Sequence, residues 1–278
     1  MRTRNLLRAS IGAAALLVTT QAALATTVEV TITNNAPNGG VYLTPVWVGF
    51  HDGSFDSYDG GAPSAPALEA LAEDGNTGPI SQVFAGTLAG DPVAGRVQGT
   101  LGGAPIAPGQ TVTQTFDLTG DGANTYFSYA SMVLPSNDYY VANGNPLAHS
   151  LQALFDGIAN EIVFNIGTAG TVNDAGTEIN DFATSAGNGL FPGLGGGQSG
   201  PNQGADEGGV NANVLGDPFG GFLNTPGGFD LSLFNFNDTS LYANGIATVR
   251  IRVVPIPAAL PLFACGLGAL GFMRRRRV

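Results

Sequence analysis

Carboxylate side chains occur in two segments whose spacing suits a hard metal cation. Asp138 follows the apolar run at 131–134 and a Pro-containing turn, so a strand would present it at its end. Asp174 and Glu178 lie on either side of Gly176, where a tight turn can bring both carboxylates to one point. Ca²⁺ takes about six to eight oxygen ligands from carboxylates, carbonyls and water. These residues alone are compatible both with a calcium site and with solvated acids that cap turns.

The other chemically active side chains do not form a catalytic or zinc-binding pattern. The chain has two His residues, His51 and His149, no G-x-S-x-G motif, and one Cys, Cys265, inside a terminal apolar segment. A nucleophilic hydrolase needs Ser or Cys beside an oriented base, and a zinc site needs more imidazole or thiolate ligands than these. The G-x-G-x-x-G match at 195–200 follows no strand and starts no helix. We therefore predict a protein that is not an enzyme, while a glycosidase-type carboxylate pair stays open.

The charge of the chain excludes nucleic acid as a partner. All ten basic residues are Arg, and seven of them lie at the two ends. The middle of the chain therefore has three Arg against 21 acids, a formal charge of −18, and such a surface cannot displace the counterions of phosphates. Asp52, Asp56 and Asp59 form a further acidic group without EF-hand spacing. We interpret them as solvated turn residues, with a weak second cation site as the alternative.

Alternating apolar residues predict the β-rich domain that must position these loops. Val28, Val30 and Ile32 alternate with polar residues, as in a half-buried strand. Further strands are expected over 41–50, 111–118, 126–134, 161–166 and 245–254. Pro45 places the first of these at an edge or a bulge, and the near-continuous apolar run at 126–134 is typical of a central strand. Short strands between Gly, Pro and Asn turns favour an all-β antiparallel β-sandwich.

One short helix and one long glycine-rich loop are expected within this domain. The sequence predicts a helix over 65–74, capped by Ser64, with Pro66 in its first turn and Gly75 at its end. Residues 187–228 contain 15 Gly and few branched apolar residues, so ordering them costs entropy and buries little. We therefore expect a surface loop or insertion at 187–228 within a single domain over 26–253.

Both ends of the chain carry targeting sequences. A basic start, an apolar stretch at 11–18 and an A-x-A site at 23–25 predict a secretory signal peptide over 1–25. Residues 256–273 contain no charge and would span about 27 Å as a helix, close to the thickness of a hydrocarbon core. Four Arg follow this segment, which predicts a transmembrane helix in the inner membrane with the domain on the outer side.

The last 25 residues resemble a bacterial sorting signal. VPIPA at 254–258, an apolar segment containing Gly266, Gly268 and Gly271, and a final Arg cluster are similar to the PEP-CTERM class, in its VPLPA variant. The resemblance implies recognition by an exosortase-type membrane protease and cleavage near the Pro motif. It also implies delivery to the cell surface or to an extracellular polymer matrix.

The domain between these signals resembles the spondin N-terminal domain, closest to its bacterial branch. The resemblance is carried by LTPVWVGFHDG at 43–53, LEALAEDG at 68–75, SMVLPSND at 131–138 and DAGTE at 174–178. It implies a β-sandwich with one bound Ca²⁺, held by Asp138, Asp174 and Glu178. Glu178 stands where animal members commonly have Asp, and the longer side chain can still bind the ion. The glycine-rich segment has no counterpart in the family.

These observations together predict an exported, surface-sorted, calcium-binding β-sandwich. It would act in adhesion or in the organisation of an extracellular matrix or biofilm, on a surface ligand that the sequence does not identify. The alternative from another class is a secreted carbohydrate-binding or carbohydrate-active protein. A structural matrix protein without bound metal is a third possibility.

Overall fold

A computed structural model describes residues 26–185, 189–191, 193–194 and 203–255. The expected signal peptide at 1–25 and the expected transmembrane helix at 256–273 lie outside these residues. In the part of the chain that is described, no helix is long and apolar enough to cross a membrane.

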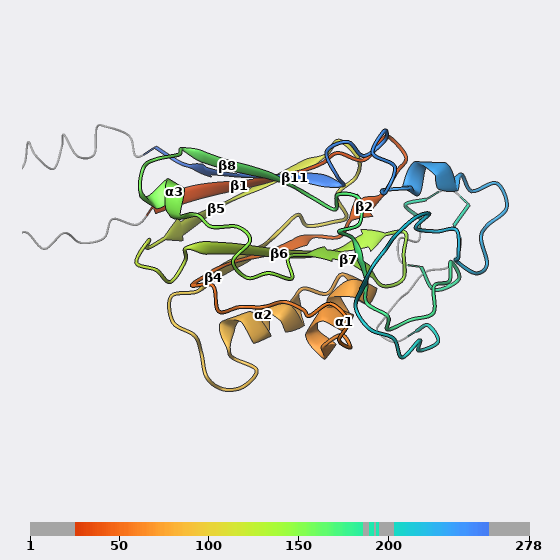
Figure 1. Cartoon of the computed structure of the whole chain (residues 1–278), viewed down its shortest axis with the longest axis horizontal. Coiled ribbons are helices and arrows are strands. Elements are labelled where there is room, and N and C mark those ends of the chain that lie inside the picture. Colours follow the sequence, from red (N-terminus) through yellow and green to blue (C-terminus); the bar gives the residue numbers. More distant parts are fainter. Residues whose placement is uncertain (1–25, 186–188, 192, 195–202, 256–278) are drawn as a thin grey trace, which may run out of the picture.

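The first of two antiparallel sheets contains four strands in the order β5–β1–β11–β8 (Figure 1). Their bounds are Thr111–Leu118 for β5, Thr26–Asn34 for β1, Ala247–Val253 for β11 and Glu161–Ile166 for β8. The predicted alternation in β1 is confirmed, because Val28, Val30 and Ile32 are fully buried while the residues between them face outward. The inner face of this sheet is therefore apolar and the outer face is rich in Thr and charged residues.

The second sheet contains seven strands and lies below the first in Figure 1. Six of them follow the order β10–β9–β7–β6–β3–β4, and β2 pairs with β6. Their bounds are Ala212–Asn213 for β10, Asn173–Asp174 for β9, Tyr139–Ala142 for β7, Tyr126–Leu134 for β6, Val46–His51 for β3, Val97–Leu101 for β4 and Tyr42–Leu43 for β2. β6 is central, as predicted. The single strand expected over 41–50 is two strands, because Pro45 has no N–H to continue the ladder.

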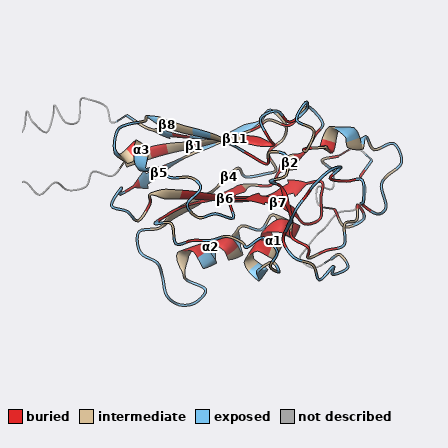
Figure 2. Cartoon of the chain, viewed as in Figure 1, coloured by how far each residue is buried: buried red, intermediate tan, exposed pale blue. Residues whose placement is uncertain are grey.

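Apolar side chains of both sheets meet in one core. Phe50 of β3 contacts Phe116 of β5 with ring centroids 5.0 Å apart, and Phe127 of β6 contacts Phe164 of β8 at 5.9 Å. Both pairs join strands of opposite sheets. Buried segments run through the facing sides of the two sheets (Figure 2). The all-β, sandwich-like prediction is thus confirmed at the level of two packed antiparallel sheets.

Two helices add a third layer on the outer side of the second sheet (Figure 1). α1 (Pro66–Asp74) and α2 (Gly78–Ala85) bury Leu71 and Phe84 against Trp47 of β3, which explains why β3 is buried on both faces. α1 is close to its predicted bounds and ends at Gly75 with φ of 65°. α2 was not predicted. A third helical turn, α3 (Gln152–Phe155), and a 3-10 turn, η1 (Leu231–Phe234), lie in connections.

The expected helix cap at Ser64 is wrong. The N-cap residue is Ala65, which makes no side-chain cap hydrogen bond. The Ser64 hydroxyl instead faces the carbonyl oxygen of Ala175 at 3.1 Å and Oδ1 of Asn211 at 2.6 Å. Ser64 therefore connects the start of the helix to two distant segments of the chain.

The glycine-rich segment buries more than its composition suggests. Its described part is largely irregular, as expected of a loop, but Phe219 and Phe222 are 1% and 7% exposed. Both rings contact Tyr139 of β7, with centroids 5.7 and 5.4 Å apart. The prediction that this segment offers little to bury is wrong, since a few aromatic residues anchor the glycine-rich backbone to the core.

Candidate metal site

Strand pairing brings two of the predicted ligands together. β7 and β9 are antiparallel, with Tyr139 opposite Asp174, and the N–H of Ala175 donates to the carbonyl oxygen of Asp138 at 3.2 Å. Asp138 and Asp174 are therefore neighbours at the start of β7 and the end of β9. Their carboxyl groups are close enough to hydrogen-bond when one of them is protonated. The structure thus joins two acids that are far apart in the sequence.

The Asp138 carboxylate is fully buried and only half satisfied. Its Oδ2 accepts hydrogen bonds from the backbone N–H groups of Thr177 and Glu178, at 3.1 and 3.2 Å. Its Oδ1 has no hydrogen-bond partner among the described residues. A buried acceptor without a donor is costly, so an ion or a proton is needed at this oxygen.

The turn after β9 holds Asp174 in place. Its Oδ1 accepts from the N–H of Gly176 at 2.8 Å, and its Oδ2 accepts from Nδ2 of Asn180 at 2.9 Å. Gly176 has φ of 64°, and a Cβ there would lie 2.6 Å from the backbone N of Val210. Only Gly fits this conformation and this close approach, which explains the Gly between the two predicted acidic ligands.

No basic side chain in the described part of the chain neutralises the Asp138–Asp174 pair. Burial, and next the Asp174 carboxylate, raise the pKa of Asp138 to about 8. The three Arg of the described chain are engaged elsewhere. Arg96 binds the carbonyl oxygen of Phe84, and Arg250 and Arg252 form exposed ion pairs with Glu161 and Glu29. The pair therefore combines the fully buried Asp138 with the half-buried Asp174, and no positive side chain of the described residues balances its negative charge.

Glu178 reaches the glycine-rich segment. Its carboxylate Oε1 accepts from the N–H of Gly204 at 2.9 Å, while its backbone N–H binds Asp138. A Cβ on Gly204 would lie 2.6 Å from the Glu178 carboxyl carbon, so the glycine lets the chain pass directly over the acid. Within the described ranges, no three acidic, His or Cys side chains form a metal-ligand group. Amide or backbone oxygens would have to complete a coordination shell.

Two Asn side chains that the sequence analysis missed carry further buried oxygens near these segments of the chain. Oδ1 of Asn137 and Oδ1 of Asn180 are both buried and lack donors within the described chain. Nδ2 of Asn137 donates to the carbonyl oxygen of Ile179 at 2.8 Å, and Nδ2 of Asn180 donates to Asp174. Both residues flank predicted ligands in the sequence, which is the signal that was available. Carboxylate and amide oxygens that accept no hydrogen bond are the kind of ligand atoms that a hard cation binds.

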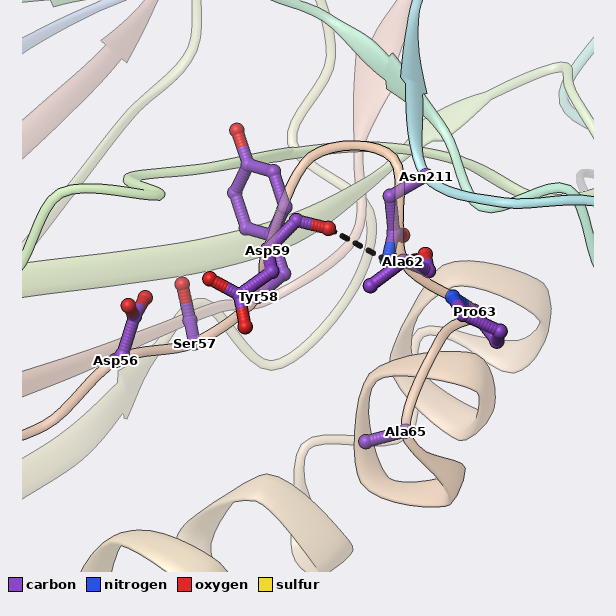
Figure 3. A pocket seen from close by; sticks show the side chains of 8 residues that line it. All are labelled: Asp56, Ser57, Tyr58, Asp59, Ala62, Pro63, Ala65 and Asn211. Carbon is purple, nitrogen blue, oxygen red and sulfur yellow. Dashed lines mark hydrogen bonds between the residues drawn. The ribbon is translucent and has the colours of Figure 1, made fainter.

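A cavity of about 270 Å³ opens beside this site. Asp174 and Asn180 form part of its wall, together with Tyr139, Leu215 and Asp217. A second cavity, of about 210 Å³, lies near the start of α1 and is lined by Asp56, Asp59 and Asn211 (Figure 3). Of the three acids at 52–59, Asp56 and Asp59 therefore line one cavity, whereas Asp52 lies outside it and accepts a hydrogen bond from the N–H of Ser54.

The two His residues make hydrogen bonds and ring contacts within the fold. His51 is fully buried, its Nδ1 accepts from the N–H of Gly53 at 3.0 Å, and its Nε2 lies 2.8 Å from Oγ of Ser128. A ring nitrogen that accepts a backbone N–H carries no proton, so Nε2 donates to Ser128. The His149 ring stacks on Phe164 with centroids 3.8 Å apart.

We expect both His residues to make the protein less stable in acid. Burial is the main cause that lowers the pKa of each from 6.5 to about 4. The unfolded chain therefore binds more protons than the native one below pH 6.5, and stability falls as the pH decreases from 6.5 to 4. Each His contributes up to about 1.4 kcal/mol per pH unit. Urea unfolding at pH 7 and pH 5 measures this slope.

The matched variant is His149→Phe, which keeps the ring on Phe164 and removes the titrating group. Its free energy of unfolding should fall less than that of the wild-type protein between pH 7 and pH 5. Equal pH slopes for both proteins would show that His149 does not contribute.

No model of a known protein family matches this chain, and no curated protein matches it either.

Proposed function

We propose that this chain is an exported calcium-binding β-sandwich protein of the spondin type that acts in adhesion or in the organisation of an extracellular matrix. The observation that carries the proposal is the Asp138–Asp174 pair, in which Asp138 is fully buried and has an unsatisfied carboxylate oxygen, with no basic neighbour among the described residues. Burying carboxylates is costly without a compensating charge. A divalent cation supplies that charge, and oxygen-rich donors favour Ca²⁺ or Mg²⁺ over softer metals.

Asp138, Asp174 and Glu178 would hold the ion, with Asn137 and Asn180 as sources of further oxygens. When bound, Ca²⁺ would neutralise the acids and tie together the segments that carry them. Those segments are the turn before β7, the turn after β9 and, through Gly204, the glycine-rich segment. The loops at this end of the sandwich would then be ordered into a surface for an extracellular ligand.

The contacts of the hydrogen-bonded Ser128–His51 pair support a function without catalysis. Oγ of Ser128 lies against Nε2 of His51, but that nitrogen carries the proton, and the hydroxyl oxygen also accepts from Nδ2 of Asn143 at 3.0 Å. Both side chains of the Ser–His pair are fully buried. A nucleophile needs a base that takes its proton and an open path to substrate, and this pair supplies neither.

Export and sorting are the part of the proposal that rests on the two ends of the chain. The signal peptide would direct the chain out of the cytoplasm, and the PEP-CTERM-like tail would anchor it in the inner membrane until an exosortase-type protease processes it. Mature protein on the cell surface should then begin near Thr26 and end near the Pro motif at 254–258. Mass spectrometry of both chain ends tests this directly.

The functional test compares surface retention with and without calcium. Cells that display the protein are washed with buffer containing a calcium chelator or the same buffer with Ca²⁺ restored, and released protein is quantified. We expect chelation to release the protein from the surface polymer. Retention that is unaffected by chelation would contradict calcium-dependent adhesion. Turnover of a glycan panel that depends on paired acids would favour the carbohydrate-active alternative instead.

A further inference from the structure

The first sheet ends in two edge strands, β5 and β8, each of which forms a ladder with one described strand only. β8 (Glu161–Ile166) is the outermost strand of the order β5–β1–β11–β8, and among the described strands it pairs only with β11 (Figure 1). An open edge presents a row of unpaired backbone N–H and C=O groups, which is a template for another strand. Natural proteins usually protect such edges with Pro, Lys, a bulge or an unpaired charge.

The pairing register shows which backbone groups of β8 are open. The N–H of Val253 donates to the carbonyl oxygen of Asn160, and Ile251 lies opposite Ile162 in the same ladder. In an antiparallel ladder, hydrogen-bonded pairs recur at every second residue. The backbone groups of the even-numbered residues of β8 therefore face β11. Those of Glu161, Val163 and Asn165 face outward from the sheet.

The usual protections are missing from β8. Its sequence, EIVFNI, contains no Pro or Lys and is rich in residues that favour strands. Its ladder to β11 runs without a bulge. Its one acid, Glu161, forms an exposed ion pair with Nη1 of Arg250 at 2.6 Å, so its charge is paired within its own sheet. Val163 is 48% exposed at the centre of the strand.

We propose that β8 is a docking edge for a second copy of this chain. Two β8 strands can pair antiparallel about a two-fold axis at Val163, because an isologous contact places each surface against itself. All three outward-facing residues of β8 then pair with residues of the second copy. Val163 lies opposite Val163 of the second copy, and each Glu161 lies opposite an Asn165. No acid faces an acid, and two four-stranded sheets become one continuous sheet.

A proline substitution at the axis tests the edge without breaking the fold. In Val163→Pro, the lost N–H points away from β11, and Pro is tolerated in an edge strand on that side. The matched control is Thr113→Pro on the opposite edge strand β5, where the register to β1 also directs the N–H outward. Light scattering on the full chain in detergent micelles should give a dimer for wild type and Thr113→Pro, and a monomer for Val163→Pro.

Disulfide trapping tests the register and does not depend on the proline variant folding. In a Cys265→Ser background, Val163→Cys places two thiols in a hydrogen-bonded antiparallel pair, with Cα atoms about 5.5 Å apart and within disulfide range. We expect rapid covalent dimers under mild oxidation. Asn165→Cys should give few, because the two Asn165 residues lie on opposite sides of the axis. Three results would each overturn the proposal. They are a monomeric wild-type chain, dimers that persist in folded Val163→Pro, and equal disulfide trapping at positions 163 and 165.

Discussion

Saturating Ca²⁺ is expected to raise the melting temperature of the purified protein by about 5 to 10 °C. An ion that binds only the folded state stabilises it by about 2.7 kcal/mol at a hundredfold excess over Kd. For a domain of this size, each kcal/mol corresponds to about 2 to 4 °C. The ion replaces a proton or an unpaired charge at Asp138, the acid whose pKa burial raises most strongly among the described carboxyl groups with a resolved shift.

Asp138→Asn should abolish this calcium effect while leaving the apoprotein folded. The amide has the same shape as the acid, and its oxygen still accepts from the N–H groups of Thr177 and Glu178. It removes an acid that burial forces to stay charged or to take up a proton, so the apoprotein should be at least as stable as wild type at neutral pH. Calorimetric titration with CaCl₂ and thermal melts of both proteins measure the difference.

Asp156→Asn is the matched control, since Asp156 follows α3, where it accepts from Nε2 of Gln152 on the surface. It changes the net charge by the same amount and should keep the full calcium shift. If Ca²⁺ produces no heat and no shift in wild type, the Asp138–Asp174 pair shares a proton instead. If Asp138→Asn retains the shift, the ion binds at another site.

Local sequence patterns predict a strand well where its residues alternate clearly between buried and exposed, or form one continuous apolar run. β5, β6 and β8 begin and end where alternation or a continuous apolar run places them. β4 was missed because its side chains are mostly half-buried and Gly99 packs against Phe116 of β5, which leaves no clear alternation. α2 was missed because its apolar face is defined by Trp47 of β3, a tertiary contact.

The candidate site shows the same division between local and distant information. Gly176 and the acids beside it mark a turn in the sequence, and the structure has one there. The neighbourhood of Asp138 and Asp174 depends on the β7–β9 ladder, and both strands are too short to predict from periodicity. The contact between Glu178 and Gly204 depends on where the glycine-rich segment returns, which composition does not encode.

Asn211 connects that returning segment to the helical layer, and Asn211→Ala is expected to lower stability by about 3 kcal/mol. Its Oδ1 accepts from the hydroxyls of Ser64 and Tyr140, at 2.6 and 2.9 Å, and its Nδ2 donates to the carbonyl oxygen of Ala62 at 2.9 Å. Asn211 is 2% exposed and Tyr140 is fully buried. Removing the amide leaves polar groups without partners, each at a cost of about 1 to 3 kcal/mol.

Asn213→Ala is the matched control from the same short segment. Asn213 is exposed and donates to the carbonyl oxygen of Gly170, so its loss exposes no buried polar group and should cost less than about 1 kcal/mol. Urea unfolding gives both values, and hydrogen exchange should show faster exchange around 203–214 in Asn211→Ala alone. Equal destabilisation by both variants would mean that the segment is held by its aromatic anchors at Phe219 and Phe222, with Asn211 contributing little.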